Sequence, residues 1–590
     1  MAAVATTTSR SERMRFSLEP VRALLFTAAL GLLVGCANKP HASSRQIASK
    51  VIPLPDLPEP AGVLAELSVA HPDATYRALR ELGRPLSGFL PAGFPMLTAS
   101  ALGVPPLSAD SFDTELPSVA VFVQEPGGTP GWVLAVHVVS GPELVAKLCS
   151  GDNAPFHSVV AKEAGLQLVE PSAASASPSA SLAVFDNYLL AASGAELLHA
   201  AGPYTARMLP RRPPAAAAIA LRFPKRALEG NVVPALRALW ARYRTRLAHS
   251  DESERSAHGG RAPDFADPAQ IILGADALVE SLLGLVDGAQ SLELDVDPLP
   301  NRLDATLLLV PEAGSEVQAK LSSFAAGNAQ SLLTLPGETQ FALGLLRTED
   351  ERGSAGKAAG DDWVRLFGSR ISEPNAQQLR AVLADWELGR GTRASYGFLG
   401  GAEPGAFLIT DVADAGRLKR AAPSLFGLLA VPALRAPLAE FLGKPSVSDG
   451  NAPTDAVAGA SRKKLTFAAN LAHPTAVPPL TFAWLVAEHE AFAAASKNAD
   501  TALKVVVQSA HGKRASLAAT AGLADSVSRI GEQAAAFAFA DARIAFGAGT
   551  EPSPVAPLLF GLGRRESSAY LRLEVSKAAV DLALHSAVGR

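Results

Sequence analysis

The chain contains two stretches that share one order of apolar runs, polar turns and helix signals, and this recurrence limits the folds open to it. Residues 132–139 form an apolar run, and Ser140 follows it as a helix N-cap. Residues 406–413 form a similar run, and Asp414 follows it as the cap, 274 positions further along. We therefore expect the same strand-to-helix unit at both places.

Two further matches keep the same chain order. In the first, two apolar pieces flank an aspartate, Asp186 or Asp541, which we interpret as a turn former. In the second, a strand leads directly into a helix. The matched segments are 183–191 with 538–546, and 217–246 with 568–588. We infer an internal duplication, and the larger displacement of the later matches predicts extra sequence in the second copy near residues 430–510.

The strand signals occur as hairpins that helices interrupt. Residues 118–123 and 132–139 flank a turn at 126–128, and residues 292–297 precede a second strand at 302–310. Hairpins separated by helices of about ten to twenty residues favour an α+β fold over strict βαβ alternation. We predict two similar lobes of antiparallel sheet, each with helices packed on one face.

Length and charge set further bounds. With 590 residues, the chain exceeds what one hydrophobic core usually organises, so we expect more than one domain. Its formal net charge of −4 and its short basic clusters argue against a nucleic-acid partner. The two largest clusters, Arg462–Lys464 and Arg211–Arg212, are interpreted as solvated turns.

The N-terminal segment has the layout of a secretory signal. Arginines at positions 10, 13, 15 and 22 precede an almost unbroken apolar run over 23–34, and a small residue, Gly35, follows. That run of about a dozen residues is too short to cross a hydrocarbon core of about 30 Å as a helix. We expect a cleavable signal peptide over 1–35, with Met14 as a possible alternative start.

The residues Leu33, Val34, Gly35 and Cys36 resemble the lipobox of bacterial lipoproteins. The resemblance implies that Cys36 receives a lipid and becomes the mature N-terminus, so that acyl chains hold the protein to a membrane. Because Ala37–Asn38 lack the aspartate that retains some lipoproteins at the inner membrane, the resemblance favours the outer membrane.

The expected domain organisation after the signal peptide has four parts. They are a proline-rich tether over 36–60, a first lobe over 61–249, a flexible segment and connecting helix over 250–290, and a second lobe over 291–590.

The arrangement of strands and helices in the body resembles that of uncharacterised secreted and lipoprotein families of bacteria, in which segments such as 335–339 lead into strands. That similarity implies no activity. No nucleophile elbow, phosphate loop, dinucleotide fingerprint or zinc spacing is present, and His489–Glu490 lacks the second histidine that a zinc-protease helix requires. We therefore assign no catalytic residue, no metal ligand and no cofactor.

A few residues deserve individual interpretations. Glu293, Asp295 and Asp297 share one face of a strand, where their like charges require water, a cation or Arg302 nearby. We favour a solvated sheet face and leave a calcium site open. His137, His157 and Cys149 are interpreted as structural residues, with Cys149 as a small buried hydrophobe and a reactive thiol as the alternative.

The residues leave two functions open. The favoured one is a membrane-anchored lipoprotein with a non-catalytic role, which binds an envelope partner or holds an apolar molecule in a groove between sheet and helices. The alternative is an envelope hydrolase whose site is assembled from loops and leaves no sequence motif.

Overall fold

A computed structural model describes residues 56–588. The internal stretches outside this description are 126–129, 151–153, 161–164, 173–179, 213–216, 258–267, 368–370, 402–403, 430, 432–444, 450–459, 468–479, 531–532 and 547–554. The signal peptide, Cys36 and most of the tether lie outside the described residues, so their assignment stays a prediction.

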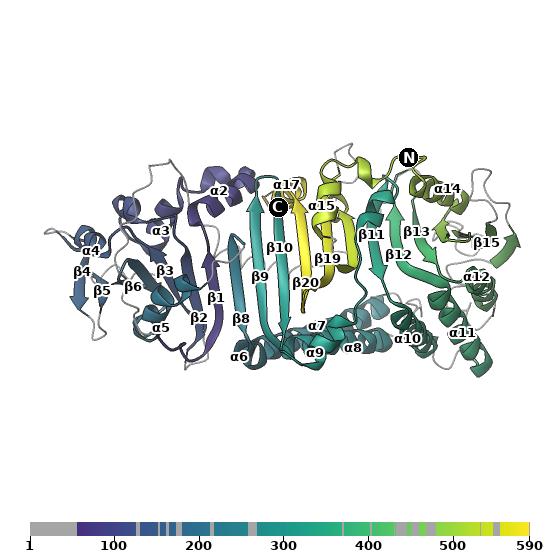
Figure 1. Cartoon of the computed structure of the whole chain (residues 1–590), viewed down its shortest axis with the longest axis horizontal. Helices are drawn as coiled ribbons and strands as arrows, with labels where there is room; N and C mark the ends of the chain where they lie inside the picture. The colour runs from purple at the N-terminus through teal and green to yellow at the C-terminus, as the bar shows by residue number, and fades with distance from the viewer. Residues whose placement is uncertain are drawn as a thin grey trace, which may run out of the picture.

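The first ten strands and their helices occupy the chain up to residue 322 (Figure 1). In chain order they are β1 (Val63–Val69), α2 (Pro72–Leu82), α3 (Phe94–Leu102), β2 (Ser118–Gln124), β3 (Pro130–His137), α4 (Gly141–Cys149), β4 (Phe156–Val160), β5 (Leu166–Pro171), β6 (Ser181–Phe185), β7 (Tyr188–Ala192), α5 (Ala195–Arg207), β8 (Ile219–Pro224), α6 (Lys225–Ala227), α7 (Val233–Ala257), α8 (Pro268–Asp287), β9 (Ala289–Leu299), β10 (Arg302–Pro311) and α9 (Glu316–Ser322).

The other ten strands follow from residue 339. They and their helices are β11 (Thr339–Leu346), α10 (Glu349–Phe367), α11 (Glu373–Gly389), β12 (Arg390–Leu399), β13 (Gly405–Val412), α12 (Ala415–Leu429), β14 (Pro445–Asp449), β15 (Ser461–Phe467), β16 (Leu480–Val486), β17 (Glu490–Ser496), α14 (Ala499–Ala510), α15 (Leu523–Ile530), β18 (Ala534–Asp541), α16 (Ala542–Phe546), β19 (Pro557–Arg565), β20 (Ser568–Ser576) and α17 (Lys577–Val588).

All twenty strands belong to one antiparallel sheet, which confirms the mixed α+β class and the antiparallel pairing expected from the sequence. From edge to edge the order is β4-β5-β6-β7-β3-β2-β1-β8-β9-β10-β20-β19-β18-β11-β12-β13-β17-β16-β15-β14. A strand from the middle of the chain, β10, thus pairs with the last strand, β20, at the centre of the sheet (Figure 1).

The strand order is the same when it is read outward from β10 and from β20. The register at the centre follows the same relation. The β9–β10 hairpin closes between Leu299 and Arg302, and the β19–β20 hairpin closes between Arg565 and Ser568. The displacement that takes Arg302 to Ser568 takes Thr306 to Arg572, and these two residues are paired across the β10–β20 ladder. A local twofold relation therefore passes through this pair.

Helices cover both faces of the outer parts of the sheet, and the expectation of helices on one face is wrong. On β3, Val133 packs in a core with Leu198 of α5, whereas Val136 packs in a second core with Leu144 of α4 on the opposite face. The reason lies in strands such as β2, where apolar residues occupy both faces instead of alternating with polar ones.

Several local predictions are confirmed. The helix Pro72–Leu82 and the β2–β3 hairpin occur as expected. The Ser140 side chain accepts a hydrogen bond from the backbone N–H of Glu143, and Asp414 accepts one from the N–H of Arg417, so both caps are formed. The units β3–α4 and β13–α12 occupy corresponding places in the strand order.

The second and third sequence matches are wrong. Residues 538–546 do not form a hairpin, because β18 ends at Asp541 and continues as the short helix α16. Asp541 is buried and paired with Arg543, whereas Asp186 lies in a tight turn with φ +52°. In the third match, β8 is third from the central ladder and β20 is part of it, so β8 corresponds in position to β18. Apolar runs recur too often to fix such equivalences without the register.

Candidate binding faces of the central sheet

The two faces of the central strands differ sharply in chemistry, because side chains alternate between faces along a strand. One face of β9 presents Glu293, Asp295 and Asp297, and the other presents Leu292, Leu294 and Val296. The cross-strand registers continue both faces from β8 to β19, so the centre of the sheet has a polar face and an apolar face.

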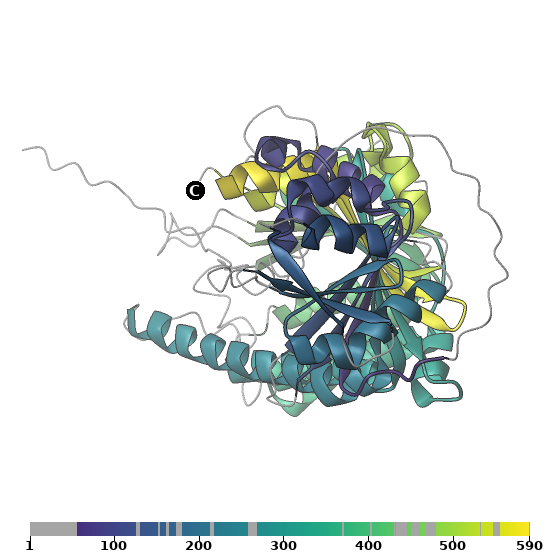
Figure 2. The ribbon, with the colours of Figure 1, turned by 90° about the vertical axis from the view of Figure 1, so that its left-hand side faces the viewer.

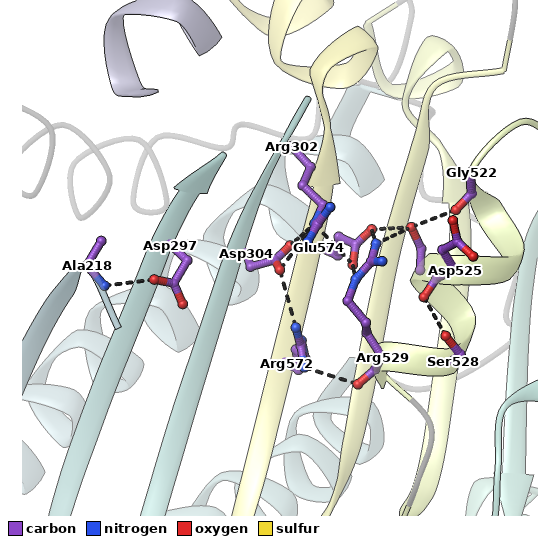
Figure 3. Close-up of polar contacts among 11 residues, drawn as sticks. Ala218, Asp297, Arg302, Asp304, Gly522, Asp525, Ser528, Arg529, Arg572 and Glu574 are labelled. Atoms are coloured by element: carbon purple, nitrogen blue, oxygen red, sulfur yellow. Dashed lines mark hydrogen bonds and ion pairs between the residues drawn. The ribbon is translucent and has the colours of Figure 1, made fainter. Parts of the chain in front are cut away.

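An ion-pair network lies at the centre of the polar face (Figure 3). Arg302 donates through Nε to both oxygens of Asp304 at 3.0 and 3.2 Å, and Arg572 Nη2 donates to Asp304 Oδ2 at 3.3 Å. Arg529 of α15 donates from Nε and Nη2 to the two oxygens of Glu574 at 3.1 and 2.8 Å. Both carboxylates are buried, and the arginines supply the hydrogen bonds and positive charge that buried carboxylates require.

The acidic triplet predicted on β9 lies beside this network and shares its face, as the strand period required. Asp297 accepts a hydrogen bond from the backbone N–H of Ala218 at 2.7 Å, and Glu293 lies 3.4 Å from Arg222. Arg302 contacts none of the three. Burial, followed by the charges of Glu293 and Asp297, raises the pKa of Asp295.

The calcium hypothesis gains no support from the described residues, among which no group of three or more potential ligands is arranged to hold a metal ion. Two carboxylates of the triplet, Glu293 and Asp297, also have different partners, Arg222 and the backbone of Ala218. The triplet therefore acts as part of a polar wall, and its neighbours define a cavity.

A cavity of about 730 Å³ opens on the polar face over β1, β8 and β9. One of its walls is Glu66, whose carboxylate accepts hydrogen bonds from the hydroxyl of Tyr204 at 2.9 Å and from Nη2 of Arg212 at 2.8 Å. Burial and the charge of Glu66 raise the pKa of Tyr204. Arg212 is thus an ion-pair partner of a buried carboxylate, and its interpretation as part of a solvated turn is wrong.

The cluster Arg462–Lys464 also differs from its prediction. These residues lie in β15, and the Arg462 and Lys464 side chains both pair with Asp500 of α14. A basic run that alternates along a strand can place two charges beside one carboxylate, which the sequence alone did not reveal.

A second cavity of about 440 Å³, which we call the arginine cavity, lies on the other side of the ion-pair network. It occupies the end of the β19–β20 hairpin and the adjacent end of α15. The residues that line it carry guanidinium, hydroxyl and amide groups and one carboxylate: Thr306, Ser528, Arg529, Gln533, Arg564, Arg565, Glu566, Tyr570 and Arg572.

The apolar face carries a continuous row of leucines across six neighbouring strands. Each leucine is paired directly with the next across the ladder, which fixes the order Leu67, Leu221, Leu294, Leu307, Leu571 and Leu562. We call these six residues the leucine row. Five strand spacings of about 4.8 Å give the row a length of about 24 Å.

The leucine row is only partly covered in the described part of the chain. Leu571 and Leu562 are 44% and 42% exposed, and the other four leucines are half-buried. The helix α17 packs on this same face against Leu558 and Val575 at one end of the strands. Figure 2 shows α17 and the long helix α7 projecting on one side of the sheet, above and below its strands. The two helices therefore lie on the side of the sheet that carries the leucine row, toward opposite ends of its strands.

Among the described residues, three histidines lie beside carboxylates, at three separate places in the fold. His137 lies 3.2 Å from Asp113, and burial lowers the pKa of its imidazole. His157 and His511 pair with Glu170 and Glu490. These partners are carboxylates, so the pairs do not bring a histidine to a nucleophile. Cys149 is half-buried at the end of α4, where burial raises the pKa of its thiol and disfavours the reactive thiolate.

Comparisons of the chain with protein-family models, with curated proteins and with solved structures found no match. Within the described part of the chain, no helix is long and apolar enough to cross a membrane. Sequence reasoning missed the leucine row and the arginines around Glu574. The alternation in residues 568–574 could have indicated a strand with one charged and one apolar face, but only the register shows which strands extend those faces.

Proposed function

We propose that this protein is a lipid-anchored component of a bacterial cell envelope that holds the acyl chains of an amphiphile on its leucine row. The exposed leucine row carries the proposal. Soluble proteins rarely expose a contiguous apolar surface of this extent without a ligand or partner. At about 24 Å, the row exceeds the depth of one leaflet, about half of a hydrocarbon core of about 30 Å, and so can accommodate an extended acyl chain.

The chemistry of the row favours an acyl chain over a protein partner. All six positions are leucine, and the neighbouring row across β9, β10, β20 and β19 is Val296, Ala305, Leu573 and Phe560. A protein interface normally includes hydrogen-bonding groups around its apolar centre. Addition of a partner strand is also excluded here, because the backbone of each central strand is paired on both sides.

The proposed lipid anchor on Cys36 supports this function, because it would keep the protein beside a membrane, which is the source of such amphiphiles. The lipobox resemblance favours the outer membrane. Replacement of Cys36 by serine should abolish incorporation of labelled palmitate and cause the uncleaved precursor to accumulate. Unchanged labelling and processing in the Cys36→Ser variant would contradict the anchor without touching the leucine row.

We also propose that the two halves arose by internal duplication. The supporting observations are the matching strand order and the twofold relation at Thr306 and Arg572. The boundary that fits this order lies after β10, so β9 and β10 close the first half instead of opening the second. In this alignment, the long helices α7 and α8 between β8 and β9 correspond to the short helix α16 between β18 and β19.

Binding of a dansylated fatty acid to the delipidated protein tests the ligand proposal. The double substitution Leu571→Lys and Leu562→Lys should weaken binding by about tenfold or more, because it places two charges on the acyl path. Both positions are partly exposed, so the fold should tolerate lysine. The control is Leu107→Lys in the short 3-10 helix Pro106–Ser111, outside the leucine row, where the side chain is 87% exposed.

Saturable binding that the double variant loses and the Leu107→Lys variant keeps would support the proposal. Two results would overturn it: no binding by the parent protein, or equal binding by the double variant. Concentration-dependent dimerisation that the double variant abolishes would assign the row to a second copy of the chain instead. No observation on the described residues favours the hydrolase alternative.

A further inference from the structure

We propose that the arginine cavity is a binding site for a phosphate monoester. The site lies on the polar face, on the opposite side of β19 and β20 from the leucine row, and the inference does not depend on acyl binding. Its volume of about 440 Å³ is within the range of small-ligand pockets. The argument depends on charge, on donor geometry and on how the donors are held.

The charges around the cavity do not cancel. In the network behind it, Arg302, Arg529 and Arg572 face two buried carboxylates, Asp304 and Glu574, so one positive charge is left over.

At the hairpin, Arg564 and Arg565 face one carboxylate, Glu566, so a second positive charge is left over. Arg565 is exposed and has no carboxylate within ion-pair distance among the described residues. Five arginines thus face three carboxylates, and Asp295 of β9, which interacts with Arg565 at longer range, offsets part of the positive excess. The excess that remains suits a phosphate monoester, which carries about −1.5 to −2 at neutral pH.

The arginine donors are preorganised. Arg529 is held by Glu574, and Arg572 by Asp304 and by the backbone carbonyl of Arg529 at 3.0 Å. Arg564 is fixed by the carbonyl oxygen of Ser322 at 2.8 Å. Because these contacts already restrict the side chains, less conformational entropy is lost when an anion binds.

The remaining lining suits tetrahedral oxyanions. The Nε of Arg572 is a buried donor without a hydrogen-bond partner among the described residues. Thr306 adds a hydroxyl donor and Gln533 adds an amide, whereas the Ser528 hydroxyl already donates to the backbone carbonyl of Asp525 at 2.8 Å. Guanidinium groups bind phosphate oxygens through paired N–H donors, and the Thr306 hydroxyl and the Gln533 amide can satisfy oxygens that the arginines do not reach. Glu566 adds one negative charge to the lining, which disfavours ligands with more negative charge than a single phosphate.

Thermal unfolding of the full chain with added inorganic phosphate tests the site, with sodium chloride at equal ionic strength as the reference. Phosphate and glycerol phosphate should raise the unfolding temperature in a saturable way. The Arg565→Gln variant should bind phosphate about tenfold more weakly, because it loses a charge-assisted contact. The control is Arg226→Gln, which removes another exposed arginine that lies outside the cavity.

Flotation with vesicles separates the two sources of such a phosphate. If the ligand is a lipid headgroup, phosphatidate vesicles should retain the protein lacking its N-terminal lipid, phosphatidylcholine vesicles should not, and Arg565→Gln should abolish retention. If the ligand is a free phosphate ester, glycerol phosphate should stabilise the protein and neither vesicle should retain it. The inference is overturned if phosphate and glycerol phosphate stabilise no more than chloride does, or if Arg565→Gln and Arg226→Gln bind equally well.

Discussion

At the scale of single residues, the largest fully buried side chain of the described chain is charged. Arg390 is 0% exposed, and its guanidinium donates to Glu387 from Nε at 3.0 Å and from Nη2 at 2.5 Å. Arg352 lies beside it and donates to the backbone carbonyls of Glu387 and Leu388, both at 3.3 Å. Burial, followed by the charge of Arg390, lowers the pKa of Arg352. Nothing in the local sequence distinguishes Arg390 from a surface arginine.

The Arg390→Met variant should lower the free energy of unfolding by about 3 kcal/mol, because it leaves the Glu387 carboxylate buried without its main partner. Urea unfolding measures this change. The double variant Arg390→Met with Glu387→Leu should recover much of the loss, since both charges are then removed. A double variant that is less stable than the single one would contradict the account.

A second residue prediction concerns pH. The raised pKa of Asp295 means that the folded protein binds this proton more tightly than the unfolded chain does. Its contribution to stability is therefore favourable below the unfolded pKa and is lost as the pH rises through the folded pKa. Asp295→Asn should stabilise the protein at pH 7 by on the order of 0.5 kcal/mol and have no such effect near pH 3. The control is Asp110→Asn at an exposed position of the 3-10 helix Pro106–Ser111. Equal effects of Asp295→Asn at both pH values, or the same pH profile for the control, would contradict the prediction.

At the scale of elements, the corresponding strands β9 and β19 show how the two halves differ. The displacement of the central hairpins places Asp295 and Asp297 at the positions of Gly561 and Gly563. A Cβ at Gly561 would overlap the side chain of Ile530 on α15, and one at Gly563 would overlap the carbonyl oxygen of Gln533. Glycine therefore lets α15 approach the second half. In the first half, the same surface is charged and lines the 730 Å³ cavity.

This comparison predicts opposite tolerances at one structural position. Gly561→Asp should lower the free energy of unfolding by about 2 kcal/mol or more, because the side chain displaces α15 and places a charge against its apolar residues. Asp295→Gly should cost about 1 kcal/mol or less, since it only weakens a strand at an open surface. Chemical denaturation of both variants provides the measurement. A smaller loss for Gly561→Asp than for Asp295→Gly would contradict the role assigned to the glycine.

The elements also show what the sequence could provide. Caps, hairpins and strand-to-helix units depend on neighbouring residues, so Ser140, Asp414 and the β2–β3 hairpin were predicted correctly. The strand equivalences depend on pairings between residues hundreds of positions apart, such as Thr306 with Arg572, and two of the three sequence matches were therefore wrong. The candidate sites could not be predicted from the sequence for the same reason, because the six residues of the leucine row come from six different strands.

At the scale of the whole molecule, the two halves are joined mainly through one ladder. β10 and β20 pair from Arg302 with Ser576 to Leu309 with Ala569, and the ion pair between Asp304 and Arg572 crosses the same boundary. Further along, the Nζ of Lys577 donates to the carbonyls of Glu81 and Leu82, which ties α17 to α2. A ladder at the centre of a sheet transmits disruption to both sides, because each strand supports its two neighbours.

The last prediction follows from this connection. Thr306→Pro removes a backbone donor at the centre of β10 and should cost about 3 kcal/mol or more. Hydrogen exchange followed by mass spectrometry should show faster exchange in residues 568–576, which belong to the other half, while residues 480–496 keep their protection. Ser158→Pro in the edge strand β4 is the control and should affect only β4 and β5. If the effect of Thr306→Pro stays within residues 289–311, the halves are independent units that touch at β10 and β20 without supporting each other.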